Sequence, residues 1–429
     1  MRYPLLLLLI VGLKSQLSYA QSGDTLRRQL IVDFEIRPRA EFSDNYMQTP
    51  ADSTMPEFYA SLRNRLSLTY TAKNFKFHAS PQEIHVWGKS GRFSRIGNIN
   101  AFEFYIEPSL NRFFSARIGR QALSLDNGRI FSAAPWSQQS RAHEGIRLFY
   151  NKRIATDLTI AFTRPYKKNF DAAYSPVASH QYKLLFVHHL KHKFKNQLAI
   201  TTINTLEVFE KSSNEGAYYQ RITNGGRLEY SRQWWYGTVS AYYQYGQTAS
   251  AKTIHAYYVQ PEISATFTKA TVRLGAEILS GNKASIPKNV SNSFVPLYGV
   301  AWKFMGNMNL FTRFPADVND KGLVNPYLFL IYQVNEKLSL RADAHLFYAQ
   351  HSLTDQELAG KYLGFENDLS LNFKPVKKVE IIFGFSSAYT AKRIELLKKV
   401  PDSGKIPVWS YLMISYSPRL LHLKYNSRK

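Results

Sequence analysis

The chain has 429 residues, with 28 tyrosines, 28 phenylalanines and no cysteine, and its 55 Lys and Arg against 31 Asp and Glu give a net charge of +24 at pH 7. The lack of cysteine excludes a disulfide framework and a lipid-acceptor thiol, and no apolar run reaches the roughly 20 residues of a membrane helix. The excess positive charge favours an anionic partner, which is a nucleic acid, an anionic lipid surface or an anionic solute.

The first twenty residues have the pattern of a signal peptide. Arg2 supplies the positive start, an apolar run extends from Leu5 to Leu13, and Ser18-Tyr19-Ala20 gives a small-x-small cleavage site before Gln21. We therefore predict a signal peptide at 1–20 and a mature chain exported past the inner membrane. An exported chain argues against nucleic acid as the partner.

The segment from Gln29 to Phe42 alternates strictly between apolar and charged residues. One phase holds Leu30, Val32, Phe34, Ile36, Ala40 and Phe42, and the other holds Asp33, Glu35, Arg37, Arg39 and Glu41. This period of two predicts a strand with one apolar and one charged face. The pattern recurs in segments of roughly ten residues, which is typical of an outer-membrane barrel whose lipid-facing and lumen-facing residues alternate.

Later strands repeat this alternation. In 58–71, Leu62, Leu66 and Leu68 oppose Arg63 and Arg65; the same pattern recurs in 271–279, 338–348 and 363–373, and 379–385 and 408–417 finish the sheet. Charge is nearly absent from the outward phase, where Arg or Lys at mid-membrane would cost about 2–4 kcal/mol. An aromatic-rich β-sandwich is the alternative fold, but too many strands would then have an apolar face with no opposing sheet to pack on.

The connections alternate between short turns and long loops. Short turns are expected at 72–74, 109–112, 151–155, 192–196, 233–235, 268–269, 335–337 and 374–377. Long stretches are expected at 43–57, 122–143, 164–179, 210–224 and 280–322. We also expect 307–325 to be part of a long loop, because Pro315 and Pro326 interrupt any strand ladder there. Eight short turns imply about 18 strands with short periplasmic turns and long extracellular loops. We predict one all-β transmembrane antiparallel barrel domain, 21–429, with strands over about 29–417 and a basic tail at 418–429.

The inward phases collect arginines and carboxylates that would line the lumen. The basic set is Arg37, Arg39, Arg63, Arg65, Arg117, Arg147, Lys183, Arg227, Arg273 and Arg341. Arginine engages carboxylates in two-pronged fashion and stays charged, and rings of Arg or Lys favour anions in pores. The alternative is that opposed Arg and Glu on neighbouring strands only brace the wall.

Residues 117–150 read RIGRQALSLDNGRIFSAAPWSQQSRAHEGIRLFY. This resembles the alginate-export family of outer-membrane barrels, whose signature has a GRQ element, a Gly-Arg pair, a Trp, an Arg and an acidic-Gly-x-Arg element. The segments 61–88 and 276–348 are also similar to that family. At the acidic element the family usually has Phe-Asp where this chain has His143-Glu144.

The resemblance implies a barrel of about 18 strands with an arginine-lined constriction for an anionic uronate polymer, acting as a monomer. Its signature carries over five candidates for that constriction or its supporting network, which are Arg120, Arg129, Arg141, Glu144 and Arg147. It also implies that the loop 122–143 folds inward and that Trp136 pins it.

The sequence holds no HExxH, GxSxG or P-loop motif, so we expect neither an enzyme nor a cofactor. His188 and His189 point to opposite faces of a strand, so we expect no metal site there with His192. We therefore predict a passive channel in the bacterial outer membrane for an anionic polysaccharide or oligosaccharide, in contact with lipid and with periplasmic export partners. The alternatives are a porin for small anionic solutes and an adhesive barrel plugged by 280–322.

Overall fold

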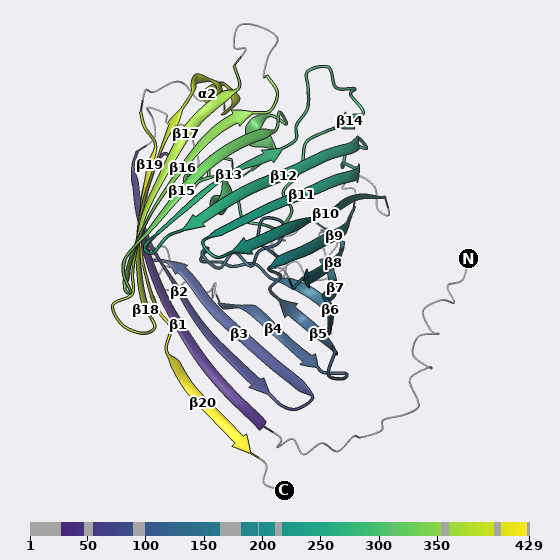
Figure 1. Ribbon diagram of the computed structural model, residues 1–429, viewed down its shortest axis with the longest axis vertical. Helices are drawn as coiled ribbons and strands as arrows, with labels where there is room; N and C mark the ends of the chain where they lie inside the picture. Colours follow the sequence, from purple (N-terminus) through teal and green to yellow (C-terminus); the bar gives the residue numbers. More distant parts are fainter. Residues whose placement is uncertain are drawn as a thin grey trace, which may run out of the picture.

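The strands of the computed structural model form one antiparallel sheet that closes on itself (Figure 1). The structure describes residues 27–46, 55–88, 99–163, 182–195, 197–210, 217–311, 313–352, 360–398 and 405–426. Within these residues each wall strand pairs with the next one along the chain, and the first pairs with the last. The result is a closed barrel of 18 strands, which confirms the predicted fold class.

The wall strands follow one another in sequence order. They are β1 (Arg27–Asp44), β2 (Glu57–Thr71), β3 (Phe75–Val86), β4 (Ile99–Pro108), β5 (Phe114–Gln121), β6 (His143–Asn151), β7 (Ala155–Phe162), β8 (Leu184–Lys193), β9 (Leu198–Glu210), β10 (Tyr218–Arg232), β11 (Trp235–Gln247), β12 (Thr253–Thr266), β13 (Ala270–Leu279), β15 (Leu323–Asn335), β16 (Leu338–Ala349), β17 (Tyr362–Phe373), β18 (Val379–Thr390), β19 (Val408–Tyr416) and β20 (Arg419–Asn426). The short elements β14 (Val290–Ser291), α1 (Trp302–Met305) and η2 (Ala316–Val318) lie between β13 and β15, and α2 (Lys392–Lys398) follows β18.

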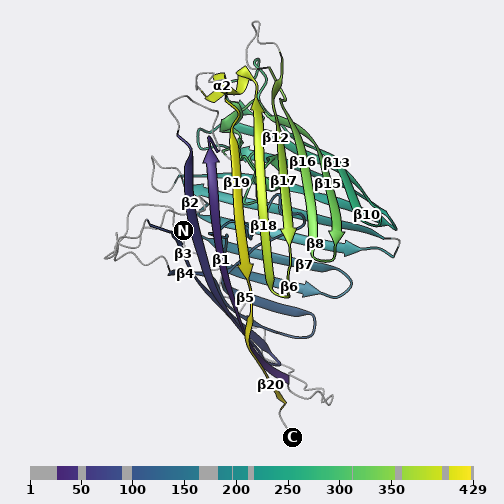
Figure 2. The ribbon, with the colours of Figure 1, turned by 90° about the vertical axis from the view of Figure 1, so that its left-hand side faces the viewer.

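The closing strand is built from two pieces. β19 pairs with β1 from Ile36 to Asp44, and β20 pairs with β1 from Arg27 to Asp33 (Figure 2). The structure thus differs from the expected tail at 418–429, because residues 419–426 continue the wall. Alternation resumes after Pro418, and the first residues of β1 need a hydrogen-bonding partner on this side of the sheet.

The predicted short turns all join consecutive strands at one end of the barrel. The long connections lie at the other end. The first residue of β1, Arg27, and the last residue of β20, Asn426, pair with each other on the short-turn side. The stretch 164–179 lies outside the described residues. The stretch 210–224 is shorter than expected, since β10 already begins at Tyr218.

Aromatic side chains gather on the outer face near both ends of the wall. On the short-turn side the exposed ones include Phe75, Phe114, Phe194, Trp234 and Phe267. On the long-loop side they include Phe58, Trp87, Tyr218 and Tyr389. Two such belts around an apolar band are the arrangement of outer-membrane barrels at the two membrane interfaces.

The interior is filled by two loops rather than by a conventional core. We call Ala122–Ala142, between β5 and β6, inner loop A, and Ser280–Gly322, between β13 and β15, inner loop B. Their apolar side chains pack together and onto the inner wall; they include Leu123, Ile130 and Phe131 of inner loop A and Phe294, Met308 and Phe311 of inner loop B. The expected loop region 307–325 extends too far by three residues, because β15 starts at Leu323 and accommodates Pro326 where pairing to β16 skips two residues.

No helix within the described residues is long and apolar enough to cross a membrane.

Candidate functional site

Inner loop A crosses the lumen between opposite parts of the wall. At one side Asp126 accepts hydrogen bonds from Thr201 Oγ1 (2.9 Å) and lies 3.1 Å from Nε2 of His189, on β9 and β8. At the other side the loop meets arginines of β1 and β2. The loop therefore narrows the lumen across its width.

Buried arginines hold inner loop A against β1 and β2. Arg37 donates to the carbonyls of Pro135 (2.8 Å) and Ser137 (2.8 Å). Arg63 pairs with Glu35 and also donates to the carbonyl of Ser137 (3.0 Å). These side chains are almost completely buried, and their hydrogen bonds hold the loop in place.

Arg65 has a related role on the same strand. It donates to Gln82 Oε1 (2.6 Å) and Ser140 Oγ (2.8 Å), and its guanidinium lies 4.1 Å from the centre of the Phe102 ring. Arg65 is therefore another contact between β2 and inner loop A.

Trp136 lies in the centre of an aromatic cluster, as the resemblance implied. Its ring centre is 5.2 Å from that of Trp302 in inner loop B and 5.8 Å from that of Trp409 in β19, and Arg39 lies over it at 4.5 Å. This one side chain joins the two inner loops to the wall.

Two further predicted arginines join the inner loops to each other. Arg129 is 2% exposed, pairs with Glu277 of β13 at 2.6 Å and donates to the carbonyl of Val300 at 3.2 Å. Arg141 donates to the carbonyls of Tyr298 and Gly299, the latter at 3.0 Å. Both were candidates for the constriction or its supporting network, and in the structure their guanidinium groups hold the inner loops in place.

Five arginines lie on the wall below the inner loops. Each lies three to five residues from the end of its strand at a short turn and pairs with a carboxylate at 2.6–2.7 Å. The pairs are Arg117–Glu107, Arg147–Asp157, Arg227–Glu229, Arg273–Glu262 and Arg341–Asp343. They form a belt of charge in the half of the lumen that faces the short turns, which we call the arginine belt.

Lys303 of α1 is a further candidate site residue, which the sequence patterns did not indicate. Its Nζ donates to the carbonyl of Asn127 at 2.8 Å, at a point where the two inner loops meet. Enclosure in the barrel lowers the pKa of this ammonium, and the positive charges of Arg273, Arg227 and Arg341 lower it further. Glu262 opposes this effect but is already paired with Arg273.

Lys303 has no carboxylate within ion-pair distance among the residues that the structure describes. The cluster of Lys303 with Arg227, Arg273 and Arg341 therefore carries net positive charge. No periodic signal marks Lys303 in the sequence, because it lies in a loop whose course depends on tertiary contacts.

Arg120 and Glu144 lie on the outer face of the barrel and not in the lumen. They pair with each other at 2.9 Å, directly across β5 and β6. They share the phase of Ile118 and Ile146, which are 46% and 39% exposed on the lipid-facing side. The prediction that these two residues line the pore differs from the structure, because Arg120 is an odd number of residues from the inward Arg117.

This placement predicts that Arg120→Ala leaves ion selectivity unchanged. The side chain is separated from the lumen by the wall, so its charge does not lie on the path of the ions. The measurement is the anion-to-cation permeability ratio from reversal potentials in a planar bilayer. Arg273→Ala in the arginine belt is the comparison and should lower that ratio; an equal fall in both variants would contradict the placement.

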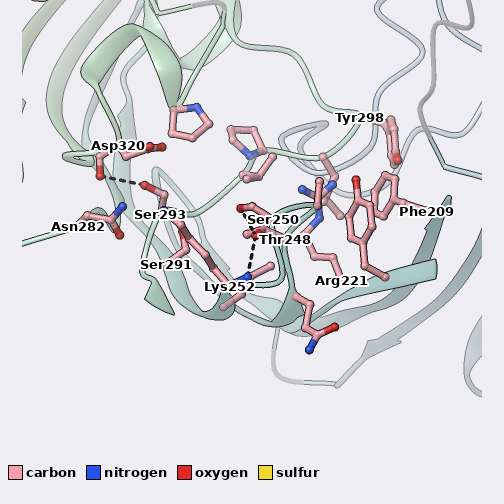
Figure 3. Close-up of a pocket in the computed structure, with 18 of the residues that line it drawn as sticks. Phe209, Arg221, Thr248, Ser250, Lys252, Asn282, Ser291, Ser293, Tyr298 and Asp320 are labelled. Carbon is pink, nitrogen blue, oxygen red and sulfur yellow. Dashed lines mark hydrogen bonds between the residues drawn. The ribbon is translucent and has the colours of Figure 1, made fainter. Parts of the chain in front are cut away.

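Two cavities flank the inner loops. The outer one, about 530 Å³, lies on the long-loop side between β10, β11, β12 and inner loop B. Figure 3 shows Arg221 and Tyr298 on one side of it and Ser293 and Asp320 on the other. The inner one, about 590 Å³, opens toward the short turns and is lined by Arg147, among others. Both have charged and hydroxyl-bearing linings, so the candidate site is a polar path interrupted by the inner loops.

The family model described as alginate export matches residues 29–388. None of the curated proteins compared with the chain matches it.

Solved structures of outer-membrane channels are similar in fold. Pseudomonas aeruginosa OccK9 (OpdG) has a TM-score of 0.62 at 10% identity, with 91% of this chain and 98% of that chain covered. Acinetobacter baumannii OccAB1 has a TM-score of 0.61 at 10% identity, with 91% and 97% covered. Pseudomonas aeruginosa OpdK, solved with vanillate, has a TM-score of 0.58 at 12% identity, with 92% and 99% covered. At these identities the likeness shows the fold alone.

Proposed function

Because the chain belongs to the alginate-export family, we propose that it passes an anionic polysaccharide or oligosaccharide through the bacterial outer membrane by passive diffusion. The protein is an outer-membrane channel, and its family and fold are of the channel type rather than those of enzymes. The finer proposal concerns the solute, its path and its partners.

The cluster of Lys303 with Arg227, Arg273 and Arg341 is the observation that carries the proposal. Within the described residues it places an uncompensated positive charge where the two inner loops meet. A polymer that bears carboxylates exchanges its contacts with water for contacts with these cations as it passes this point. Pores that favour anions use Arg or Lys in this way.

The arginine belt suits a solute that has to leave as well as enter. Each belt arginine already has a carboxylate partner, so a uronate carboxylate competes with that partner and is held weakly. Weak contacts at several successive positions allow movement along the path without trapping. We further propose that the barrel acts as a monomer and receives its cargo from periplasmic export partners.

A porin for small anionic solutes is the second candidate. The buried pair Arg129–Glu277 and the hydrogen bonds of Arg37 and Arg63 hold inner loop A against the wall. The inner loops divide the lumen into cavities of about 530 and 590 Å³, sizes that suit a small solute. The likeness to OpdK, whose solved structure contains vanillate, fits this candidate equally well.

Block of single-channel current by uronate oligomers of increasing length distinguishes the two. If the path carries a polymer, block by polyuronate should strengthen with chain length, because each added carboxylate reaches a further cation of the belt. A neutral oligosaccharide series of the same lengths is the control. Block that is equal for monomer and octamer would favour the small-solute porin, and a cation-selective channel would contradict both.

A further inference from the structure

Four metal-ligating side chains form a square on the inner face of β16 and β17. Asp343 lies directly opposite Asp368 across the two strands, and His345 lies directly opposite Glu366. All four side chains are buried, between 0 and 9% exposed. One ligand atom each of Asp343, His345 and Asp368 lies within 4.8 Å of the other two.

The square carries more negative charge than its neighbours among the described residues neutralise. Arg341 pairs with Asp343 at 2.7 Å. Oδ1 of Asp368 and Oε2 of Glu366 are buried and have no hydrogen-bond partner among the described residues. Like charges opposite each other destabilise a sheet, and a buried carboxylate oxygen without a partner costs free energy, so a cation or protons must occupy this place.

The hydrogen bonds of His345 orient its ring as they do in metal sites. Nδ2 of Asn325 donates to the carbonyl of Phe304 at 2.5 Å, so Oδ1 of Asn325 accepts from Nδ1 of His345 at 3.2 Å. A neutral ring that donates through Nδ1 presents the lone pair of Nε2, which here lies 3.9 Å from Oδ2 of Asp368. Metal-bound histidines almost always donate their other N–H to such an acceptor.

We propose that Asp343, His345 and Asp368, with Glu366 beside them, bind one divalent transition-metal ion, for which Zn²⁺ is the probe. An imidazole nitrogen together with carboxylates favours zinc and its neighbours over Ca²⁺ and Mg²⁺, which prefer oxygen ligands alone. Aromatic rings hold the imidazole in place, since His345 stacks on Phe347 with ring centres 5.8 Å apart. This rigidity pre-organises the nitrogen ligand.

The site lies directly beneath inner loop B and would hold it. The backbone N–H of Asn307 donates to Asp368 Oδ2 at 3.1 Å, and that of Met308 donates to Glu366 Oε1 at 2.7 Å. Between them and α1, Gly306 approaches the Glu366 carboxylate so closely that a Cβ would clash with it. A metal that fixes these carboxylates therefore fixes the loop that carries Lys303.

The test is calorimetric titration of the folded, detergent-solubilised barrel after treatment with a chelator. We expect saturable binding of one Zn²⁺ per barrel, and at least tenfold weaker binding of Ca²⁺ and Mg²⁺. His345→Gln and Asp368→Asn should each abolish or strongly weaken Zn²⁺ binding, and Asn325→Ala should weaken it about 10–100-fold.

His188→Gln is the matched control, because His188 contacts Thr156 and Asn204 on the wall away from the square. It should bind Zn²⁺ as the unaltered chain does. The mobility shift between unheated and heated samples on a gel identifies folded barrels, so that only folded variants are compared. If the folded unaltered chain does not bind Zn²⁺, the proposal is overturned. The carboxylates of the square would then be stabilised by protons that they share. Unchanged binding in His345→Gln, or a preference for Ca²⁺, would also overturn it.

Discussion

Arg129→Met is expected to lower the free energy of unfolding by about 3–5 kcal/mol, because it removes one partner of a completely buried ion pair. Glu277 is 0% exposed and pairs with Arg129 at 2.6 Å. Tyr258 donates one hydrogen bond to Glu277 Oε1 at 2.8 Å, while Oε2 has no partner among the described residues. Without the guanidinium, the carboxylate remains charged in a site that water does not reach. Urea unfolding of the refolded barrel, followed by tryptophan fluorescence, measures the loss.

Two comparisons make this expectation specific. Arg313→Ala removes a 78% exposed partner of Asp317 and should cost roughly 0–1 kcal/mol. The double variant Arg129→Met with Glu277→Gln removes both charges and should recover part of the loss. A cost below about 1 kcal/mol for Arg129→Met alone would contradict the role of this pair as the main link between inner loops and wall.

The wall of the barrel could be predicted from the sequence because it follows from local patterns. Leu62, Leu66 and Leu68 alternate with Arg63 and Arg65, and the structure places these two sets on opposite faces of β2 as expected. The short turns follow from breaks in the same pattern. Alternation and turn spacing together determine strand number, and they require no knowledge of distant contacts.

Two predictions are wrong at places where the local alternation already gives the observed arrangement. Arg117 and Arg120 are three residues apart, and so are Glu144 and Arg147, so neither pair can share one face of a strand. The period of two therefore already places Arg120 and Glu144 with Ile118 and Ile146. The closing strand was ended at residue 417 although Leu421, Leu423 and Tyr425 continue the alternation after Pro418.

The constriction could not be predicted because its contacts join residues far apart in the sequence. Arg37 meets Gln138 across 101 positions, and Arg129 meets Glu277 across 148. Each of these arginines has the appearance of a pore-lining cation in the sequence. Only the course of inner loops A and B shows that carbonyl and carboxylate groups surround Arg37 and Arg129. The same course leaves the charge of Lys303 accessible in the lumen.

Lys303→Glu is expected to produce the largest change in ion selectivity of any single substitution in the lumen. A unit charge about 4 Å from a permeating anion contributes roughly 1 kcal/mol in water, or a factor of about 5 in occupancy. Lys303→Ala should therefore lower the anion-to-cation permeability ratio about 5-fold, and the reversal of charge in Lys303→Glu should lower it further. The new carboxylate would also engage Arg273 and Arg341, which removes further positive charge from the path.

Reversal potentials under a salt gradient, with the barrel in a planar bilayer, measure this ratio. Lys337→Glu is the matched control, because it makes the same change of charge on the exposed turn between β15 and β16. Raising the salt concentration should shrink the effect at Lys337 more than at Lys303, since screening acts more strongly on exposed charges. If Lys303→Glu and Lys337→Glu alter selectivity equally, the positive charge that determines selectivity is spread over the mouth of the barrel. If only Lys303→Glu alters it, the anion passes where inner loops A and B meet.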